Sequence, residues 1–197
     1  MDKLVLASGN RGKLKEFQQI FAQRDIRVLP QAHFNIDDVE ETGLTFVENA
    51  ILKARHAAKI SGLPALADDS GLEVDALRGK PGIYSARFSG PEATDQSNND
   101  KLLKMLSQVP ADNRTARFHC VLVLMRHAED PTPMIFHGQW QGQILSQARG
   151  TQGFGYDPLF FANDQQACAA ELPPEVKNQV SHRGQAVTKL IRALQLG

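Results

Sequence analysis

Short apolar strands that alternate with amphipathic helices are the feature that most constrains how this chain can fold. Residues 4–7 are apolar or small and predict a buried strand, and residues 8–13 form a glycine-containing turn after it. The helix that follows has apolar residues at helical spacing: Leu14, Phe17, Ile20 and Phe21. A second strand is predicted over residues 26–29, so the chain opens with a strand, a helix and a strand.

The rest of the chain continues this alternation. Thr45 and Glu48 have capping-box spacing, which predicts a helix that begins after Thr45 and ends at Gly62 and Pro64. Further elements are predicted in this order: a strand at 65–67, a turn at 68–71, a strand at 72–74, a loop at 79–91, a helix at 95–106, an antiparallel pair of strands at 116–126 and 134–145, a strand at 159–161 and a helix from near Ser181. This order predicts an α/β fold, a mixed sheet with helices packed on it, in a single domain over residues 1–197.

Composition excludes several classes of function. Among 197 residues, 22 Lys and Arg balance 22 Asp and Glu, and a neutral chain lacks the positive charge that nucleic-acid coats and membrane-surface binders need. Cys120 and Cys168 form no disulfide or metal-binding pattern. The N-terminus has no apolar segment of signal-peptide length, and no apolar run is long enough to cross a bilayer. We therefore expect a soluble, cytoplasmic protein without a nucleic-acid or membrane partner.

The turn at residues 8–13 is a candidate phosphate site. Its backbone N–H groups and the N-terminus of the next helix attract anions, and Lys13 adds a full positive charge. The turn is not a P-loop, because Ala7 and Leu14 stand where that pattern needs Gly and Ser or Thr. An ordinary strand-to-helix turn with a solvated lysine explains these residues equally well.

Carboxylates gather in two places. Residues 28–52 contain five acidic residues and no Lys or Arg: Asp37, Asp38, Glu40, Glu41 and Glu48. Asp68 and Asp69 follow an apolar strand, and adjacent carboxylates there repel each other unless a cation or a lysine lies between them. Mg²⁺ held by carboxylates and substrate phosphates suits this pattern. The alternative, an Asx-type turn through Asp68 to Gly71, is favoured when these residues are taken alone.

Basic residues occur in matching places. Lys53 lies on the helix that follows the acidic segment. Lys177 and the predicted turn at Ser181, His182 and Arg183 lie before the last helix, where side chains in loops often bind ligands.

The segment from Gly153 to Pro158 predicts an unusual loop. Gly153 and Gly155 flank Phe154 and leave its ring with little cover, which suits stacking on a nucleobase. The alternative is that Phe154 and Tyr156 fill the core. The histidines outside the last basic segment lack metal-ligand spacing. His119 and His127 lie in or beside a strand pattern, so we expect these two to be structural.

Six segments taken together resemble the inosine-triphosphate pyrophosphatase family, and within it the bacterial members, over essentially the whole chain. They are Ser8–Lys13, Glu40–Gly43 with Thr45–Ala50, Ala67–Leu72, Pro81–Arg87, Gly153–Pro158 and Ser181–Gly184. The resemblance implies a homodimer with an elongated mixed sheet and two lobes around a nucleotide cleft. It also implies Mg²⁺-dependent hydrolysis of non-canonical purine nucleoside triphosphates (ITP, dITP, XTP) to the monophosphate and pyrophosphate, which removes deaminated purines from the nucleotide pool.

The resemblance also implies roles for individual residues. Those expected to act in catalysis are Asp69 as general base, with Lys13, Lys53 and Asp68. The expected metal ligands are Asp69, Asp68 and either Glu40 or Glu41, between which the sequence does not choose. Phosphate and sugar are expected to contact Ser8, Gly9, Asn10, Arg11, Gly12, Lys13 and Ser70. The purine is expected to contact Phe154, Gly155, Tyr156, Asp157, Lys177, His182 and Arg183.

The hydrogen-bonding groups of the purine bases explain why donor side chains suit this site. Hypoxanthine and xanthine carry a 6-keto acceptor where adenine carries an amino donor, so hydrogen-bond donors such as Lys177, His182 or Arg183 favour the keto purines. Two alternatives remain open at this point: a pyrophosphatase for other modified nucleotides, and a nucleotide-sensing module without catalysis. A sensing module has no need for Asp68 and Asp69, and pyrophosphate release from a panel of nucleotides separates all three.

Overall fold

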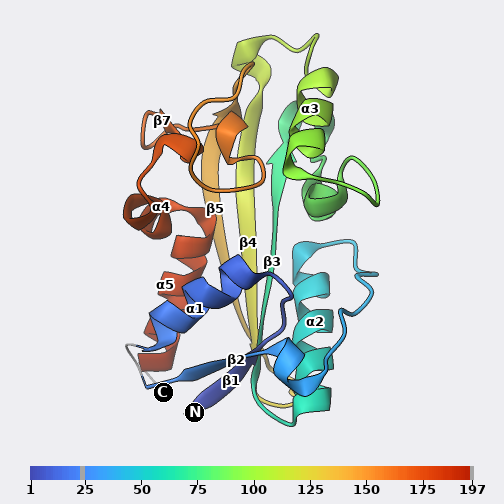
Figure 1. Cartoon of the computed structure of the whole chain (residues 1–197), viewed down its shortest axis with the longest axis vertical. Coiled ribbons are helices and arrows are strands. Elements are labelled where there is room, and N and C mark those ends of the chain that lie inside the picture. The colour runs from blue at the N-terminus through green and yellow to red at the C-terminus, as the bar shows by residue number, and fades with distance from the viewer. Residues whose placement is uncertain (23–24, 196–197) are drawn as a thin grey trace. The chain divides into compact units, whose positions relative to one another are not determined.

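The computed structural model describes residues 1–22 and 25–195. These residues form a mixed sheet, most of whose strands are labelled in Figure 1. Its seven strands stand in the order β2-β1-β3-β4-β5-β6-β7. The strands are β1 (Lys3–Leu6), β2 (Arg27–Pro30), β3 (Ala65–Val74), β4 (Thr115–Met125), β5 (Met134–Ile144), β6 (Phe160–Ala162) and β7 (Ala167–Cys168). β1 pairs in parallel with β2 and β3, whereas β6 pairs antiparallel with β5 and β7. The predicted α/β fold with a mixed sheet is confirmed.

The helices are α1 (Arg11–Ala22), α2 (Phe46–Ser61), α3 (Asp95–Met105), α4 (Pro174–Val180) and α5 (His182–Gln195). As predicted, the Thr45 side chain caps α2 by accepting a hydrogen bond from Glu48 N–H. Gly62 ends α2 with φ +66°, a left-handed conformation that glycine adopts without steric cost. Within the described residues, no helix combines the length and the apolar character needed to cross a membrane.

The chain divides into two compact units. The first unit comprises residues 1–69 and 121–136, and the second comprises residues 70–120 and 137–197. β3, β4 and β5 each contribute residues to both units. The expected single domain over residues 1–197, with a nucleotide cleft between two lobes, stays a prediction.

Small residues bring α2 close to the sheet of the first unit. Four alanines of α2 are buried in the core of this unit with residues of β1, β3 and β4: Ala50, Ala54, Ala57 and Ala58. Alanine loses little entropy in a helix and has no long side chain to hold two elements apart. The close packing fixes the polar side chains that α2 presents at the edge of this core.

The core of the second unit is larger and more aromatic. It contains Phe118 of β4, Trp140 of β5 and Phe160 of β6, with Leu102 of α3 packed among them. A Cβ added at Gly138 of β5 would lie 1.9 Å from the backbone oxygen at the start of α5, so only glycine allows this close approach. The start of α5 is therefore held directly against the sheet.

Two local expectations were wrong. β3 runs without interruption through Asp68–Gly71, so the predicted strand end and the Asx-type turn are both absent from this segment. Lys177 lies in α4, and His182 and Arg183 lie in the first turn of α5, rather than in a loop or turn before a helix. Pro174 is the signal that could have revealed α4, because proline favours the first turn of a helix.

Candidate functional site

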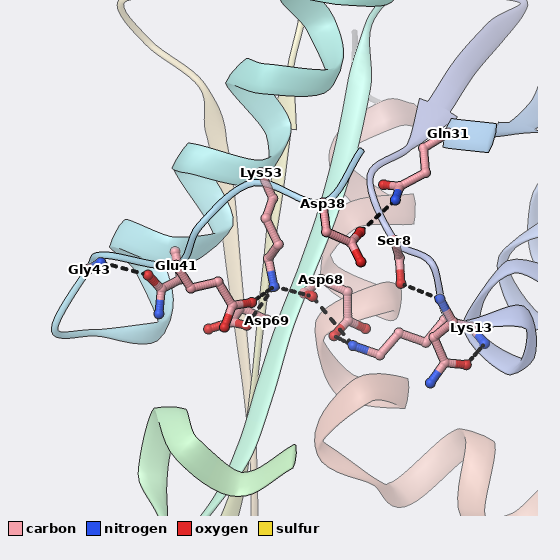
Figure 2. Close-up of polar contacts among 11 residues, drawn as sticks. Ser8, Lys13, Gln31, Asp38, Glu41, Gly43, Lys53, Asp68 and Asp69 are labelled. Atoms are coloured by element: carbon pink, nitrogen blue, oxygen red, sulfur yellow. Dashed lines mark hydrogen bonds and ion pairs between the residues drawn. The ribbon is translucent and has the colours of Figure 1, made fainter. Parts of the chain in front are cut away.

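Two lysines from different helices hold the adjacent aspartates of β3 (Figure 2). Lys13 Nζ of α1 lies 2.7 Å from Asp68 Oδ1, and Lys53 Nζ of α2 lies 2.6 Å from Asp69 Oδ1. Neighbouring side chains of a strand point to opposite faces of the sheet, so each aspartate meets a different lysine. The uninterrupted strand therefore explains how adjacent carboxylates are tolerated there.

Lys53 also binds oxygens beyond Asp69. Its ammonium donates to Glu41 Oε1 at 3.0 Å and to the backbone oxygen of Asp68 at 3.2 Å. Three oxygen atoms from two segments of the chain thus converge on a single positive charge. The Lys53 side chain is 17% exposed, and that of Asp69 is 11% exposed, so water screens this pair only in part.

Burial perturbs both partners of this ion pair. Burial raises the pKa of Asp69 above its ordinary value, and the Lys53 ammonium offsets only part of that rise. Burial alone would lower the pKa of Lys53, but its contacts with Asp69 and then Glu41 outweigh burial and raise that pKa. Asp69 Oδ2 is buried and has no hydrogen-bond partner among the described residues. A buried carboxylate oxygen without a partner is suited to accept a proton or bind a cation.

The structure separates the two glutamates that the sequence could not. Glu41 reaches the Lys53 ammonium, whereas Glu40 is exposed. Gly43 holds the segment that carries Glu41 against α2: its N–H donates to Asn49 Oδ1 at 2.8 Å. A Cβ added at Gly43 would lie 2.6 Å from that same oxygen, so a larger residue would displace the segment.

The predicted turn at residues 8–13 is shorter than expected, because α1 already begins at Arg11, and side chains of this segment cap the start of the helix. Asn10 Oδ1 accepts a hydrogen bond from Lys13 N–H at 3.1 Å, and Ser8 Oγ accepts one from Asn10 N–H at 3.2 Å. These bonds satisfy donors that a helix start leaves free. Gly9, Asn10, Arg11 and Gly12 are exposed. Their contact with phosphate stays a prediction, as does that of Ser70, which follows Asp69 in β3 and is half-buried.

Asp38 and Gln31 form a hydrogen-bonded pair close to this segment. Asp38 accepts a hydrogen bond from Gln31 Nε2 at 2.7 Å (Figure 2). Its carboxylate lies close to Gly9. A Cβ added at Gly9 would be 3.6 Å from Asp38 Oδ2, an ordinary contact distance. Asp38 belongs to the acidic segment noted in the sequence, but nothing in the sequence pairs it with Gln31.

In the second unit, residues 153–157, the Phe154 loop, present an exposed aromatic ring. Phe154 is 55% exposed between Gly153 and Gly155, which have φ of +78° and +63°. Its N–H donates to Asp157 Oδ2 at 2.8 Å. A Cβ added at Gly153 would lie 2.1 Å from this oxygen, so the loop needs glycine there for space as well as for φ.

Two cations gather around the exposed ring. Lys177 Nζ lies 5.2 Å from the ring centroid of Phe154, and Arg183 Cζ lies 5.8 Å from it. Lys177 is held there by an ion pair with the buried carboxylate of Asp157. The structure thus brings together four of the residues predicted to contact a purine.

Tyr156 and His182, also predicted to contact a purine, are buried, as is Arg183. Tyr156 donates its hydroxyl hydrogen to the backbone oxygen of Ser85 at 2.7 Å, and burial raises the pKa of this phenol. Of the two aromatic residues in the loop, Tyr156 therefore fills the core and Phe154 does not. The His182 ring stacks on Phe118 with 4.7 Å between ring centroids. His182 and Arg183 lie just after Ser181, whose Oγ accepts a hydrogen bond from Gly184 N–H.

The described residues contain no cluster of three or more His, Cys, Asp or Glu side chains arranged to hold a metal ion. Mg²⁺ is commonly bound by only one or two carboxylates together with substrate phosphates. Asp69 and Glu41 are the carboxylates that converge. Asp68 is engaged by Lys13, and the exposed Glu40 lies outside this group.

Comparison with known proteins places the chain in a family. The sequence profile of the Ham1 family matches residues 4–193. The dITP/XTP pyrophosphatase of Photobacterium profundum is 59% identical over 195 residues, 99% of each chain. That of Escherichia coli O157:H7 is 58% identical over 197 residues, all of each chain. The solved structure of a Ham1 protein from Coxiella burnetii has a TM-score of 0.95 at 50% identity and covers all of both chains. The resemblance that the six sequence segments indicated is confirmed, and the chain belongs to the Ham1 family.

Proposed function

We propose that this protein hydrolyses non-canonical purine nucleoside triphosphates, such as dITP, XTP and ITP, to the nucleoside monophosphate and pyrophosphate. Relatives named dITP/XTP pyrophosphatase, similar over their whole length, support this substrate class. The observation that carries the proposal is the arrangement in β3: two adjacent carboxylates, each held by a lysine from a different helix, with Asp69 Oδ2 left unpaired.

The reaction requires a base and positive charge. Water attacks the α-phosphorus, a new P–O bond forms, and the bond to the bridging oxygen breaks, so that pyrophosphate leaves with that oxygen. Asp69 Oδ2, which is buried and has no hydrogen-bond partner among the described residues, accepts the proton that the water loses. Lys13 and Lys53 neutralise charge on the phosphate oxygens, assisted by the N-terminus of α1.

Mg²⁺ is proposed as the cofactor because the donor set suits a hard cation. Asp69 Oδ1, Glu41 Oε1 and the backbone oxygen of Asp68 already converge on the Lys53 ammonium, and all three are oxygen donors. Asp69 and Glu41 would hold the ion. When bound, Mg²⁺ supplies further positive charge for the phosphate oxygens. Asp68 is assigned to fixing Lys13, and Glu40 is not assigned as a ligand.

Base selection is proposed for the Phe154 loop and its two cations. The exposed Phe154 ring stacks on the purine. Lys177 and Arg183 donate to the 6-keto oxygen, and His182 supports Arg183 at the start of α5. Adenine would place its amino donor against the donors of Lys177 and Arg183. Binding of adenine nucleotides is strongly disfavoured, because these donors would lose water without gaining an acceptor.

We also propose that the protein is a homodimer, as the family resemblance implies, and that it lies in the cytoplasm, as its composition predicts. Light scattering coupled to gel filtration measures the assembly directly: a dimer mass supports this part, and a monomer mass at all concentrations contradicts it.

The substrate proposal is tested by a nucleotide panel in Mg²⁺. Purified protein is incubated with dITP, XTP, dGTP, dATP and dTTP, and pyrophosphate and orthophosphate are measured separately. We expect rapid pyrophosphate release from dITP and XTP, with chelation of Mg²⁺ abolishing it. Orthophosphate as the product, or equal rates with dATP and dGTP, would refute the proposal.

A further inference from the structure

Both backbone polar groups of Gly155, in the Phe154 loop, form hydrogen bonds with side chains of α3. Its N–H donates to Asp95 Oδ2 at 2.8 Å, and its carbonyl oxygen accepts from Asn99 Nδ2 at 2.8 Å. Asp95 and Asn99 stand four residues apart on α3, so their side chains lie on the same face in successive turns. One face of a helix thus engages both backbone polar groups of a single loop residue.

The N-terminal end of α3 is held in place by its own hydrogen bonds. Thr94 and Ser97 form a reciprocal capping box at its start. Asn98, which is 4% exposed, accepts from Ser89 N–H at 2.8 Å and donates to the backbone oxygen of Ala86 at 3.2 Å. The first two turns of α3 are therefore a rigid support for whatever they bind.

Only one orientation of the Asn99 side-chain amide can form the hydrogen bond to the Gly155 oxygen. The glycine oxygen needs a donor, so Asn99 turns Nδ2 toward it, and Asn99 Oδ1 is left buried without a partner among the described residues. A flipped amide would place two oxygens against each other. An aspartate of the same shape has no donor to offer when ionised.

We propose that Asp95 and Asn99 are positioning residues, which fix Gly155 and so orient the Phe154 ring before a purine binds. This inference rests on the proposed function, in which Phe154 stacks on the base. Gly155 has φ +63° and no side chain to hold it, so its orientation depends on these outside bonds. Without them the loop must be ordered at the moment of binding, which weakens substrate binding and leaves the chemical step unchanged.

Isosteric substitutions separate the two bonds from side-chain volume. Asn99→Asp removes the donor, and we expect it to raise KM for dITP about tenfold while kcat stays within about twofold. Asp95→Asn keeps an acceptor and should restore nearly normal kinetics, whereas Asp95→Ala should raise KM as Asn99→Asp does. Gln96→Ala is the matched control, because Gln96 lies on the exposed side of α3 and bonds to Asp100.

Amide hydrogen exchange without substrate gives a readout independent of catalysis. We expect faster exchange in residues 153–157 of Asn99→Asp and Asp95→Ala, and no change in Gln96→Ala. If Asn99→Asp and Asp95→Ala both leave the exchange rates and KM unchanged, the inference is overturned. A decrease in kcat without a change in KM would overturn it as well. If the wild-type protein releases no pyrophosphate from dITP, the proposed function fails separately. The exchange measurement then still decides whether α3 fixes the loop.

Discussion

Replacing Lys53 with methionine should reveal how much the first unit depends on this ammonium. Lys53→Met keeps an unbranched apolar stem but leaves Asp69 and Glu41 without their shared cation. Breaking a fully buried pair costs about 3–5 kcal/mol, and an exposed pair contributes about 0–1 kcal/mol. With side chains 17% and 11% exposed, the Lys53–Asp69 pair lies nearer the buried limit, so we expect a loss of about 2–3 kcal/mol in the free energy of unfolding.

The assay is thermal unfolding followed by circular dichroism. For a chain of this size each kcal/mol shifts Tm by about 2–4 °C, which gives a fall of about 4–12 °C. Lys59→Met, an exposed lysine of the same helix, is the control and should change the free energy of unfolding by about 0.5 kcal/mol or less. Adding Asp69→Asn to Lys53→Met removes the stranded charge and should recover most of the loss.

The pH dependence of this defect has a defined sign. Burial already raises the pKa of Asp69 above its ordinary value of 3.8, and losing Lys53 raises it further. A carboxyl whose folded pKa exceeds its unfolded pKa destabilises the fold when ionised, and this penalty disappears as the pH falls through the folded pKa. The gap in Tm between the wild type and Lys53→Met should therefore narrow as the pH falls from neutral toward the ordinary range of an aspartate. A Lys53→Met loss below about 0.5 kcal/mol, or strict additivity in the double variant, would refute this reasoning.

Three further changes test other parts of the account. Asp69→Asn should lower kcat by about 10²–10⁴-fold with the fold intact, as measured by pyrophosphate release, and an unchanged kcat would remove Asp69 as the base. Gly153→Ala, whose Cβ would meet Asp157, should raise KM for dITP much more than it changes kcat in steady-state kinetics; an unchanged KM would show that the loop adapts. Thr45→Ala removes the cap that accepts from Glu48 N–H and should cost about 1 kcal/mol in chemical denaturation, with a stability equal to wild type contradicting the capping role.

Strongly patterned segments of the fold could be predicted from the sequence. The capping box at Thr45 and the helical spacing of Phe17 and Phe21 are local signals, and the elements they predicted are present. The turn predicted at Asp68–Gly71 was wrong because the segment continues as a strand between β1 and β4 in the sheet, where lysines of two helices pair with its aspartates. Lys13 lies 55 residues from Asp68 in the sequence, and only the folded chain brings it there.

The types of residue at the candidate site could be predicted, but their pairing could not. Alternation along a strand assigns Asp68 and Asp69 to different lysines, which follows only once the segment is known to be a strand. The sequence favoured an exposed Phe154 ring but also allowed Phe154 and Tyr156 both to fill the core, and their burial in the structure decides between these alternatives. Asn99 gave no sequence signal, since its partner in the Phe154 loop lies 56 residues away.

Hydrolysis of dITP in ¹⁸O-labelled water is the most direct test of the central claim. If a water activated by Asp69 attacks the α-phosphorus, the label enters the phosphate of the monophosphate and the released pyrophosphate carries none. Mass spectrometry of the separated products distinguishes these outcomes. Label in pyrophosphate or orthophosphate, or no turnover of dITP in Mg²⁺, would contradict the account.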